Sequence, residues 1–279
     1  MNQMPESWLS IALRALVIGL LLIWSVVPVS MIVLSSFKPT PDIFTYPPTL
    51  LFEPTLEHYR TLWEKWPDFF LTLRNSAIIA LCAMALTVFS SALAGYVYSR
   101  YRSSALAGSA VFLVAIRLLP PIVITLPLYP VVDFLKLSDS YTLLILLYAT
   151  FFVSLGTMIL KTFIDGIPEE LDQAAIIDGA SELQILWRII VPLSAQGAVA
   201  ASIFVFVYAW NEYLFAFIFT TTRAKTAPVV ISEMMASLNG VDWGLLFAAA
   251  TTQLLPVVTF VVLVQKYLIA GLTAGSVKG

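Results

Sequence analysis

The chain has 279 residues, of which 59% are hydrophobic and 11% are charged, and its formal net charge is −2. Soluble domains carry about 25% charged residues, so this composition excludes an ordinary soluble globular protein and indicates an integral membrane protein. A net charge this close to zero gives no reason to expect a nucleic acid as partner.

Six apolar segments are long enough to cross a bilayer as helices, which takes roughly 20 residues each. The expected spans are residues 11–34, 69–98, 105–129, 139–160, 194–220 and 243–268. Backbone polar groups must be satisfied inside lipid, and the sequence lacks the two-residue alternation of a membrane barrel. We therefore expect an all-α integral membrane fold, with residues 1–279 forming one transmembrane domain.

The first two spans and the segment between them carry few chemical signals. The first span is longer than a signal-peptide core of about 7–15 residues, so we expect it to be retained. Residues 35–68 are rich in proline and then show an amphipathic patch around Leu62 and Trp63, which predicts an interfacial helix. His58, the only histidine, is expected to be solvated, and Cys82, the only cysteine, to be a small core residue.

The third span contains Pro120, Pro121 and Pro127, which break or kink a helix. Such a break is typical of a gate or path helix, but membrane helices also tolerate proline for shape alone. Lysine and arginine divide evenly between the two sides of the predicted spans, so charge does not set the orientation.

Residues 168–192, PEELDQAAIIDGASELQILWRIIVP, form a polar segment between the fourth and fifth spans. Pro168 suits the first turn of a helix, where the acids that follow it are favoured by the helix dipole. Gly179 is the expected helix end. Ser181 and Gln184 have the spacing of a capping box that starts a second helix. The pattern predicts helix, glycine, helix at the membrane surface.

Four residues of the first of these helices share one face by their spacing: Leu171, Ala174, Ala175 and Asp178. The alanines permit close approach of another backbone. The helix is therefore either a projection that fits a groove in another protein or a connector that packs under its own bundle, and both interpretations stay open.

The stretch QAAIIDG, followed nine residues later by IIVP, resembles the cytoplasmic signature of ABC importer permeases, E-A-A-x3-G-x9-I-x-L-P. Gln173 stands where the family has Glu, and Val191 where it has Leu. The acids Glu170 and Asp172 are candidates to supply the missing charge. SSFKP, LRNSAI, LLPPIVITLPLY, YAWNEYLFAFIF and GLTAGSVKG extend the similarity to carbohydrate-uptake permeases of the type of the smaller maltose importer permease.

This resemblance implies the type I importer fold: six spans, both termini cytoplasmic, and a coupling helix at residues 168–180 that contacts a separate ATPase. It assigns that contact to Glu170, Asp172, Gln173, Ala174, Ala175, Asp178 and Gly179. The chain itself would be no enzyme and would bind no cofactor or metal, and it lacks the G-x-x-x-x-G-K-[ST] phosphate loop. ATP and Mg would bind the partner ATPase.

The implied partners are a second homologous permease, an ATPase homodimer, a substrate-binding protein and a sugar-like small molecule. The implied location is the cell (inner) membrane of a bacterium or archaeon. Alternatives are importers of a polyol, glycerol phosphate or polyamine. A stand-alone secondary transporter is a further alternative, but it predicts inverted repeats and acidic relays that the sequence does not show.

Polar residues at membrane depth are the candidates for a substrate path: Arg117, Asn211, Glu212 and Gln253. A charge there costs at least about 2.5–3.5 kcal/mol unless it faces protein or water. These residues either bind sugar hydroxyls or join helices, with Arg117 and Glu212 as an internal ion pair. Both interpretations stay open.

The aromatic residues Tyr129, Trp210 and Tyr213 are further path candidates, because aromatic rings stack on sugars. Packing is the favoured interpretation for them, since aromatic residues at helical spacing more often fill a core. The resemblance implies two more contacts: loop 221–242 with the binding protein, and tail 275–279 with the ATPase dimer. A plain connector and a frayed end are the alternatives.

Overall fold

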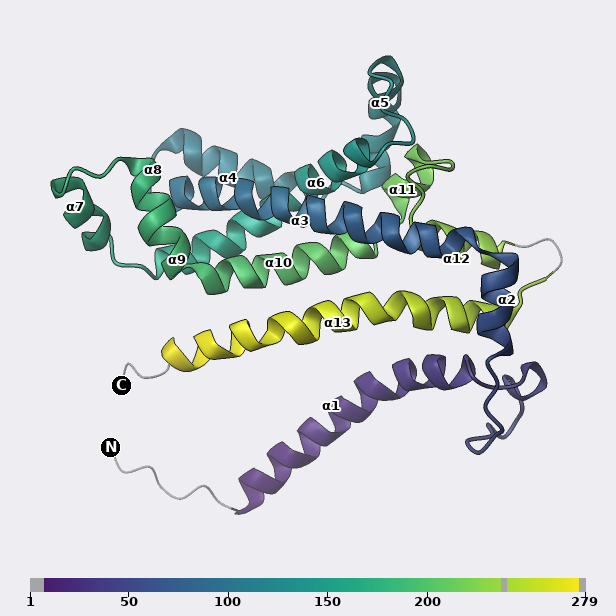
Figure 1. Ribbon diagram of the computed structural model, residues 1–279. Helices are drawn as coiled ribbons and strands as arrows, with labels where there is room; N and C mark the ends of the chain where they lie inside the picture. The colour runs from purple at the N-terminus through teal and green to yellow at the C-terminus, as the bar shows by residue number, and fades with distance from the viewer. Residues whose placement is uncertain (1–7, 237–239, 276–279) are drawn as a thin grey trace. The chain divides into compact units, whose positions relative to one another are not determined.

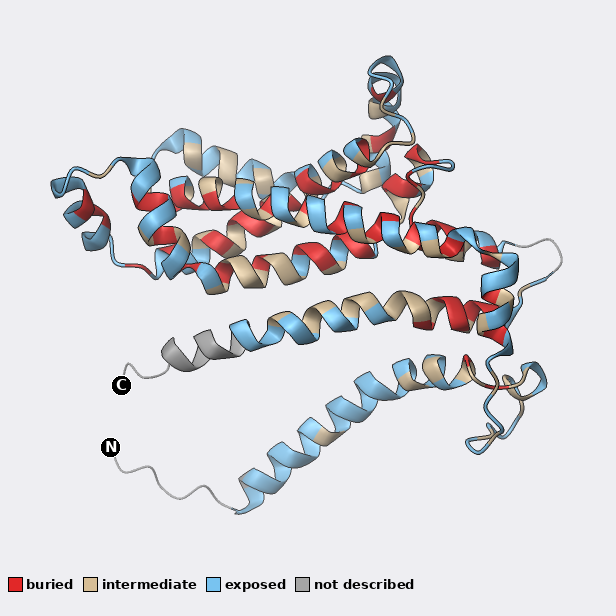
Figure 2. Cartoon of the chain, in the orientation of Figure 1, coloured by how far each residue is buried: buried red, intermediate tan, exposed pale blue. Residues whose placement is uncertain are grey.

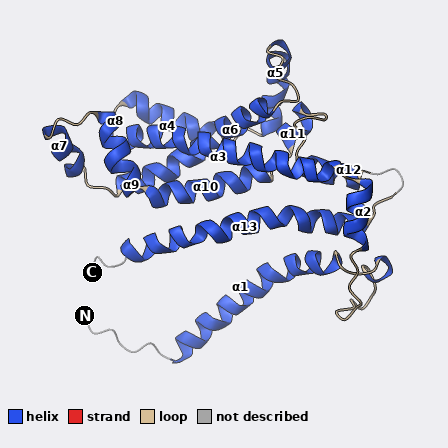
Figure 3. Ribbon diagram, viewed as in Figure 1, coloured by secondary structure: helices blue, strands red, loops and turns tan. Residues whose placement is uncertain are grey.

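The computed structural model describes the backbone of residues 8–236 and 240–275. Within these ranges the secondary structure is helical and contains no strand (Figure 3), so the all-α prediction is confirmed. The chain divides into two compact units, each described by itself. The first comprises residues up to Pro67 together with Ile231–Leu254, and the second comprises Asp68–Val230 with the residues from Leu255 onward.

The first unit contains one long apolar helix and the segment that follows it. Its helices are α1 (Trp8–Ser35), the 3-10 turn η1 (Thr40–Asp42) and α2 (Glu57–Lys65), with the end of α12 (Ala227–Met235) and the start of α13 (Trp243–Gly275). A helix is therefore present where the sequence predicts one, as α2. Leu62 is its buried anchor, whereas Trp63 is exposed.

His58 of α2 is buried, so the prediction of a solvated histidine is wrong. Its Nε2 lies 2.7 Å from the carbonyl oxygen of Lys38. Gly244 allows this packing: a Cβ added there would meet the ring at 2.1 Å. The first turns of α13 are correspondingly buried, as Figure 2 shows. This pairing could not be predicted from local sequence patterns, because His58 and Gly244 are far apart in the chain.

The second unit is a bundle in which α3, α6 and α10 lie side by side (Figure 1). Its elements are α3 (Asp68–Arg100), α4 (Ser104–Ile116), α5 (Pro121–Phe134), α6 (Tyr141–Asp165), α7 (Glu170–Ile177), α8 (Glu182–Ile185), the π-helical turn η2 (Leu186–Ile190), α9 (Val191–Leu193), α10 (Ala195–Trp210) and α11 (Leu214–Phe219).

Small residues bring α3 and α6 close together. A Cβ on Gly156 of α6 would lie 2.4 Å from Oγ of Ser91, and one on Gly95 of α3 would lie 3.1 Å from the backbone nitrogen of Lys161. Close approach at small residues is how membrane helices pack, since lipid supplies no hydrophobic drive between them. Cys82 of α3 is exposed, so its expected place in the core is wrong.

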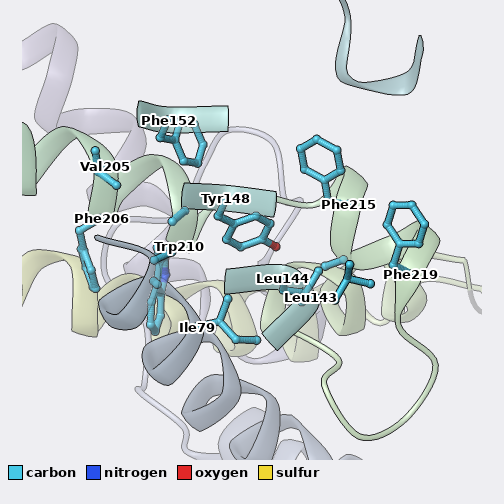
Figure 4. Packing of buried hydrophobic residues seen from close by; sticks show 14 of the residues in the cluster. Ile79, Leu143, Leu144, Tyr148, Phe152, Val205, Phe206, Trp210, Phe215 and Phe219 are labelled. Carbon is cyan, nitrogen blue, oxygen red and sulfur yellow. The ribbon is translucent and has the colours of Figure 1, made fainter. Parts of the chain in front are cut away.

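The bundle core is aromatic and aliphatic. Tyr148 and Phe152 of α6 pack with Phe206 and Trp210 of α10 and with Phe215 of α11 (Figure 4). The ring of Phe206 also stacks on Phe260 of α13, with centroids 4.0 Å apart. These contacts fix α10 and α11 on α6.

Membrane-length helices agree with most of the predicted spans. In the described part of the chain four helices are long and apolar enough to cross a membrane, or up to six if each of two bent pairs counts as one span. One pair is α4 with α5, where the third predicted span bends by 98°. Pro120 and Pro121 cause this break, because proline removes the donor of the i to i−4 bond. The other pair bends by 76° at Ser194, just before α10.

Candidate functional site

The segment from Ile164 to Val191 forms one end of the second unit, and α7 projects beyond the bundle there (Figure 1). The helix is shorter than the predicted 168–180, since only Glu170–Ile177 are helical. Gly179 ends it with φ +82°, a conformation that favours glycine, as predicted. The capping box is also confirmed: the amide of Ser181 donates to Gln184 Oε1 at 2.8 Å, and the amide of Gln184 donates to Ser181 Oγ at 3.4 Å.

A buried ion pair fixes α7 to the bundle. Arg100 Nε, at the end of α3, donates to Asp172 Oδ2 at 2.6 Å, and the two side chains are only 8% and 10% exposed. The same guanidinium donates to the carbonyl oxygens of Ile167, at 3.0 Å, and Ile164, at 3.3 Å. One arginine thus holds the end of α6, the connector and α7. A planar group with five donors suits this task.

A small apolar cluster continues this anchor. Ala175 of α7 is buried with Tyr96 of α3, Ile164 of α6 and Ile185, Leu186 and Ile190 of the segment after Gly179. Beside it, the hydroxyl of Tyr101 donates to Glu182 Oε1 at 2.6 Å. That bond to a carboxylate raises the pKa of Tyr101 to about 12, so the phenol stays protonated.

The outer face of α7 is apolar and exposed. Ile177 is 86% exposed, Ile176 59% and Leu171 43%, and Gln173, Ala174 and Asp178 are exposed as well. The predicted common face of Leu171, Ala174, Ala175 and Asp178 is therefore divided, because Ala175 turns inward. Asp172 also turns inward to Arg100, so it does not supply a charge on the outer face. Glu170 is exposed and therefore remains a candidate to supply the charge of the missing family Glu.

Arg117 does not pair with Glu212, so the expected ion pair is wrong. Arg117 ends α4 at the break before α5, and among the described residues it has no carboxylate within 4.0 Å. It lines a mostly apolar cavity of about 320 Å³ with Thr150, Phe151 and Phe215. Glu212 instead accepts the amides of Phe215, at 3.0 Å, and Ala216, at 3.4 Å, in the first turn of α11. A carboxylate is favoured at a helix N-terminus.

The other path candidates divide between packing and exposure. Trp210 is buried and stacks on Phe206, as the packing interpretation holds. Tyr213 stacks on Phe217 with centroids 5.2 Å apart. The side chain of Asn211, the residue after α10, donates to the carbonyl oxygen of Val207. The α10 helix ends at Trp210, earlier than the fifth predicted span.

Two further candidates lie elsewhere. Tyr129 of α5 is 57% exposed and stacks on Phe219. Gln253 belongs to the first unit, and its Oε1 is buried without a hydrogen-bond partner. Of the path candidates, Arg117 and Glu212 are linked through Phe215, which lines the cavity with Arg117 and donates its amide to Glu212. Asn211 and Tyr213 flank Glu212 in the chain. The described residues contain no group of three or more His, Cys, Asp or Glu side chains that could hold a metal ion.

Sequence reasoning missed a second anchor, at the opposite end of the bundle. Asp139 accepts the amides of Arg223, at 2.9 Å, and Ala224, at 3.0 Å, and also contacts Thr221 and Thr222. Asn75 donates to the carbonyls of Arg223 and Lys225. Burial opposes ionisation of Asp139, but the amide bonds outweigh it and hold its pKa well below the usual range. The sequence signal that could have indicated this anchor is the stretch LRNSAI, which contains Asn75.

Part of the predicted binding-protein loop 221–242 is thus anchored, although residues 237–239 lie outside the described residues. The tail predicted to contact the ATPase, residues 275–279, also lies outside them except for Gly275.

Comparisons with known proteins agree with this architecture. The family model described as "Binding-protein-dependent transport system inner membrane component" matches residues 87–273. The trehalose/maltose transport system permease protein of Thermococcus litoralis is 35% identical over 268 residues, covering 95% of this chain and 96% of that protein. The inner membrane ABC transporter permease protein YcjP of Escherichia coli is 32% identical and covers 94% of each.

A solved structure shows the same fold. The crystal structure of a bacterial ABC transporter involved in the import of the acidic polysaccharide alginate contains a chain that matches with a TM-score of 0.72 and 16% identity. The match covers 96% of this chain and 99% of that one. At this identity the likeness concerns the fold alone.

The fold and these matches define a membrane permease of the ABC importer type. The chain belongs to the family of binding-protein-dependent transport system inner membrane components. It is a multi-pass inner membrane protein and the permease component of an ABC transporter, not itself an enzyme. Membership in a binding-protein-dependent ABC system implies ATPase and binding-protein partners.

Proposed function

We propose that this chain, acting as one transmembrane domain, imports a sugar or related polyhydroxylated solute delivered by a substrate-binding protein. It pairs with a second, homologous permease in the inner membrane of a bacterium or archaeon, with both termini in the cytoplasm. ATP and Mg²⁺ bind a separate ATPase homodimer. The α7 helix is the coupling helix that docks on that ATPase.

The observation that carries the proposal is the combination of an exposed apolar face on α7 and a buried ion pair beneath it. Ile176 and Ile177 project from the bundle, whereas Asp172 ties the same helix to Arg100. An exposed apolar patch at the tip of a rigidly held helix is typical of a helix-in-groove contact.

Coupling follows from this geometry. Closure of the ATPase dimer moves the docked α7, and the contacts of Arg100 pass the displacement to the ends of both α3 and α6. The bundle then moves as a rigid body, which is the usual route from inward-open to outward-open states.

Relatives support the sugar assignment. The names of similar proteins specify trehalose/maltose, trehalose, diacetylchitobiose and sulfoquinovosyl glycerol transport. The residues proposed to line the path in this chain are Arg117, Asn211, Glu212 and Tyr213, with Tyr129, Trp210 and Gln253 as the remaining candidates.

The test is to tag the chain, purify it in mild detergent and identify the co-purifying proteins while measuring ATP hydrolysis. We expect a second permease, a P-loop ATPase and vanadate-sensitive hydrolysis. A Gly179→Val variant should keep the complex assembled but lose at least about tenfold in sugar-stimulated hydrolysis. The reason is that a β-branched residue is strained at positive φ and misdirects the segment after α7.

Gly108→Val is the matched control. A Cβ at Gly108, like one at Gly179, meets nothing within 4 Å, but Gly108 lies within α4 and has no positive φ. Wild-type coupling in Gly179→Val would contradict the assignment of α7. A chain that purifies alone, and takes up sugar in liposomes with a proton or sodium gradient, would favour the secondary transporter instead.

A further inference from the structure

The ends of three helices line two neighbouring cavities near α7. The α3 helix ends at Arg100, α4 begins at Ser104 and α6 ends at Asp165. Between them lies a groove of about 500 Å³, and a polar cavity of about 430 Å³ adjoins it. Tyr98, Arg102 and Lys161 line both, so the two form one continuous surface. Of this surface, the proposed transport function uses Arg100 and Ile167, whereas Arg102, Lys161 and Glu169 have no part in it.

The groove becomes apolar along α4. Leu106, Ala107 and Ala110 line it from the first two turns of the helix. Tyr98 and Tyr101 line it at the end of α3, and the hydroxyl of Tyr98 lies 2.8 Å from Oγ of Ser109. Tyrosines at the level of the headgroups with small apolar residues beneath them form the lining that a lipid chain contacts.

Charged side chains line both cavities. Arg102 is exposed and has no ion pair among the described residues. Lys161 lines both cavities together with Arg102. Asp165, which pairs with Lys161 at 2.6 Å, and Glu169 line only the polar cavity. Glu169 itself has no ion pair within the described part of the chain. Arg102 and Lys161 are therefore the cations of the groove. The polar cavity, which both also line, adds Arg100, whose guanidinium is bound to Asp172, and the unpaired carboxylate of Glu169.

We propose that this surface binds one phospholipid whose headgroup carries a primary ammonium, as in phosphatidylethanolamine. The phosphate lies between Arg102 and Lys161, an acyl chain follows Leu106 to Ala110, and the ammonium points to Glu169. Charge complementarity supports this occupant: basic sites between helix ends bind phosphate headgroups, and a carboxylate accepts hydrogen bonds from a primary ammonium. The methylated ammonium of phosphatidylcholine has no proton to donate.

The bound lipid touches the joint before the coupling helix. Gly166, Ile167 and Pro168 line the polar cavity, and they connect α6 to α7. A headgroup in this place fills the space beside the joint, next to the Arg100 side chain that holds Asp172. Lipid composition would then influence how firmly α7 is held.

Native mass spectrometry of the full-length chain in mild detergent tests the proposal. The probes are phosphatidylethanolamine, phosphatidylglycerol and phosphatidylcholine with identical acyl chains. We expect retention of phosphatidylethanolamine to exceed that of phosphatidylcholine by roughly tenfold, the factor that about 1.4 kcal/mol produces. Arg102→Gln should lower retention of all three lipids. Glu169→Gln should remove only the preference for ethanolamine.

Arg188→Gln is the matched control, because Arg188 is another exposed arginine of the same end of the unit but lines neither cavity. It should leave retention unchanged. Equal retention in Arg102→Gln and the wild type would overturn the proposal. So would displacement of the lipid by millimolar inorganic phosphate, or a cross-link from Ala107→Cys to a partner permease in the assembled complex. None of these results would affect the importer assignment, which rests on other residues.

Discussion

Arg100 shows how one side chain decides the position of the coupling segment. Its guanidinium bonds Asp172 and two carbonyls of the α6–α7 joint, and it is almost fully buried. A buried charge pair contributes little net stability against an apolar pair, but removal of one partner leaves an uncompensated charge. The value of the pair is therefore geometric: it defines where α7 points.

We predict that Arg100→Gln destabilises the second unit by about 3–5 kcal/mol, since it leaves Asp172 buried and unpaired. Arg100→Gln combined with Asp172→Asn should recover part of this loss. A double-mutant cycle on thermal unfolding in detergent measures the coupling. The exposed pair Arg60–Glu64 is the control, with side chains 79% and 56% exposed, and its removal should change little. Additive effects of the Arg100 and Asp172 changes would contradict the proposed pairing.

Asp139 has the same role at the other end of the bundle, and there the prediction concerns pH. Asp139→Asn should destabilise the protein by about 1–2 kcal/mol at pH 7, through weaker hydrogen bonds in a partly exposed site. Asparagine tolerates the φ of +54° at this position, so the change tests the charge alone.

The sign of the pH dependence follows from the lowered pKa of Asp139. A depressed native pKa contributes stability that is complete above the unfolded value of about 3.9 and is lost as the pH falls toward the native value. The difference between wild type and Asp139→Asn should hold from pH 8 to about pH 5 and shrink below about pH 4. Thermal unfolding across this range measures it. Asp133→Asn, an exposed change on α5, is the control, and an equal deficit at low pH would refute the assignment.

At the scale of the elements, small residues decide which helices touch. Gly156 faces Ser91 and Thr87 so closely that a Cβ would lie 2.4 Å from Ser91 Oγ. We predict that Gly156→Val separates α3 from α6 and costs about 1–3 kcal/mol or more through overpacking. Thermal unfolding measures the cost. Gly19→Val in α1 is the control, because nothing lies within 4 Å of that position.

Local signals explain which elements could be predicted from the sequence. Gly179, Ser181 and Gln184 act on their immediate neighbours, so the helix end and the capping box could be predicted from the sequence. Arg100 and Asp172 are 72 residues apart, and only the packing of α3 against α6 brings them together. The predicted ion pair of Glu212 with Arg117 was wrong because a carboxylate at membrane depth was expected to pair with a cation. Glu212 instead accepts two amides of α11, the helix that it precedes.

At the scale of the whole molecule, α6 determines which residues lie on opposite sides of the membrane. Its 25 residues span about 37 Å, which exceeds the hydrocarbon thickness. Ser138 precedes α6, Ile177 is the last residue of α7, which follows α6, and both residues are exposed. These two positions must therefore lie on opposite sides if α6 crosses the bilayer.

We predict that Ile177 is cytoplasmic and Ser138 is extracytoplasmic. The chain has one cysteine, so Cys82→Ala gives a background for Ser138→Cys and Ile177→Cys. A membrane-impermeant maleimide applied to intact spheroplasts should label the first variant only, and both after lysis and removal of the docked ATPase. The lysed sample is the control for reactivity. Labelling of Ile177→Cys in intact cells would place α7 on the side without ATP, where it could not meet an ATPase, and the coupling assignment would fail even if the fold were correct.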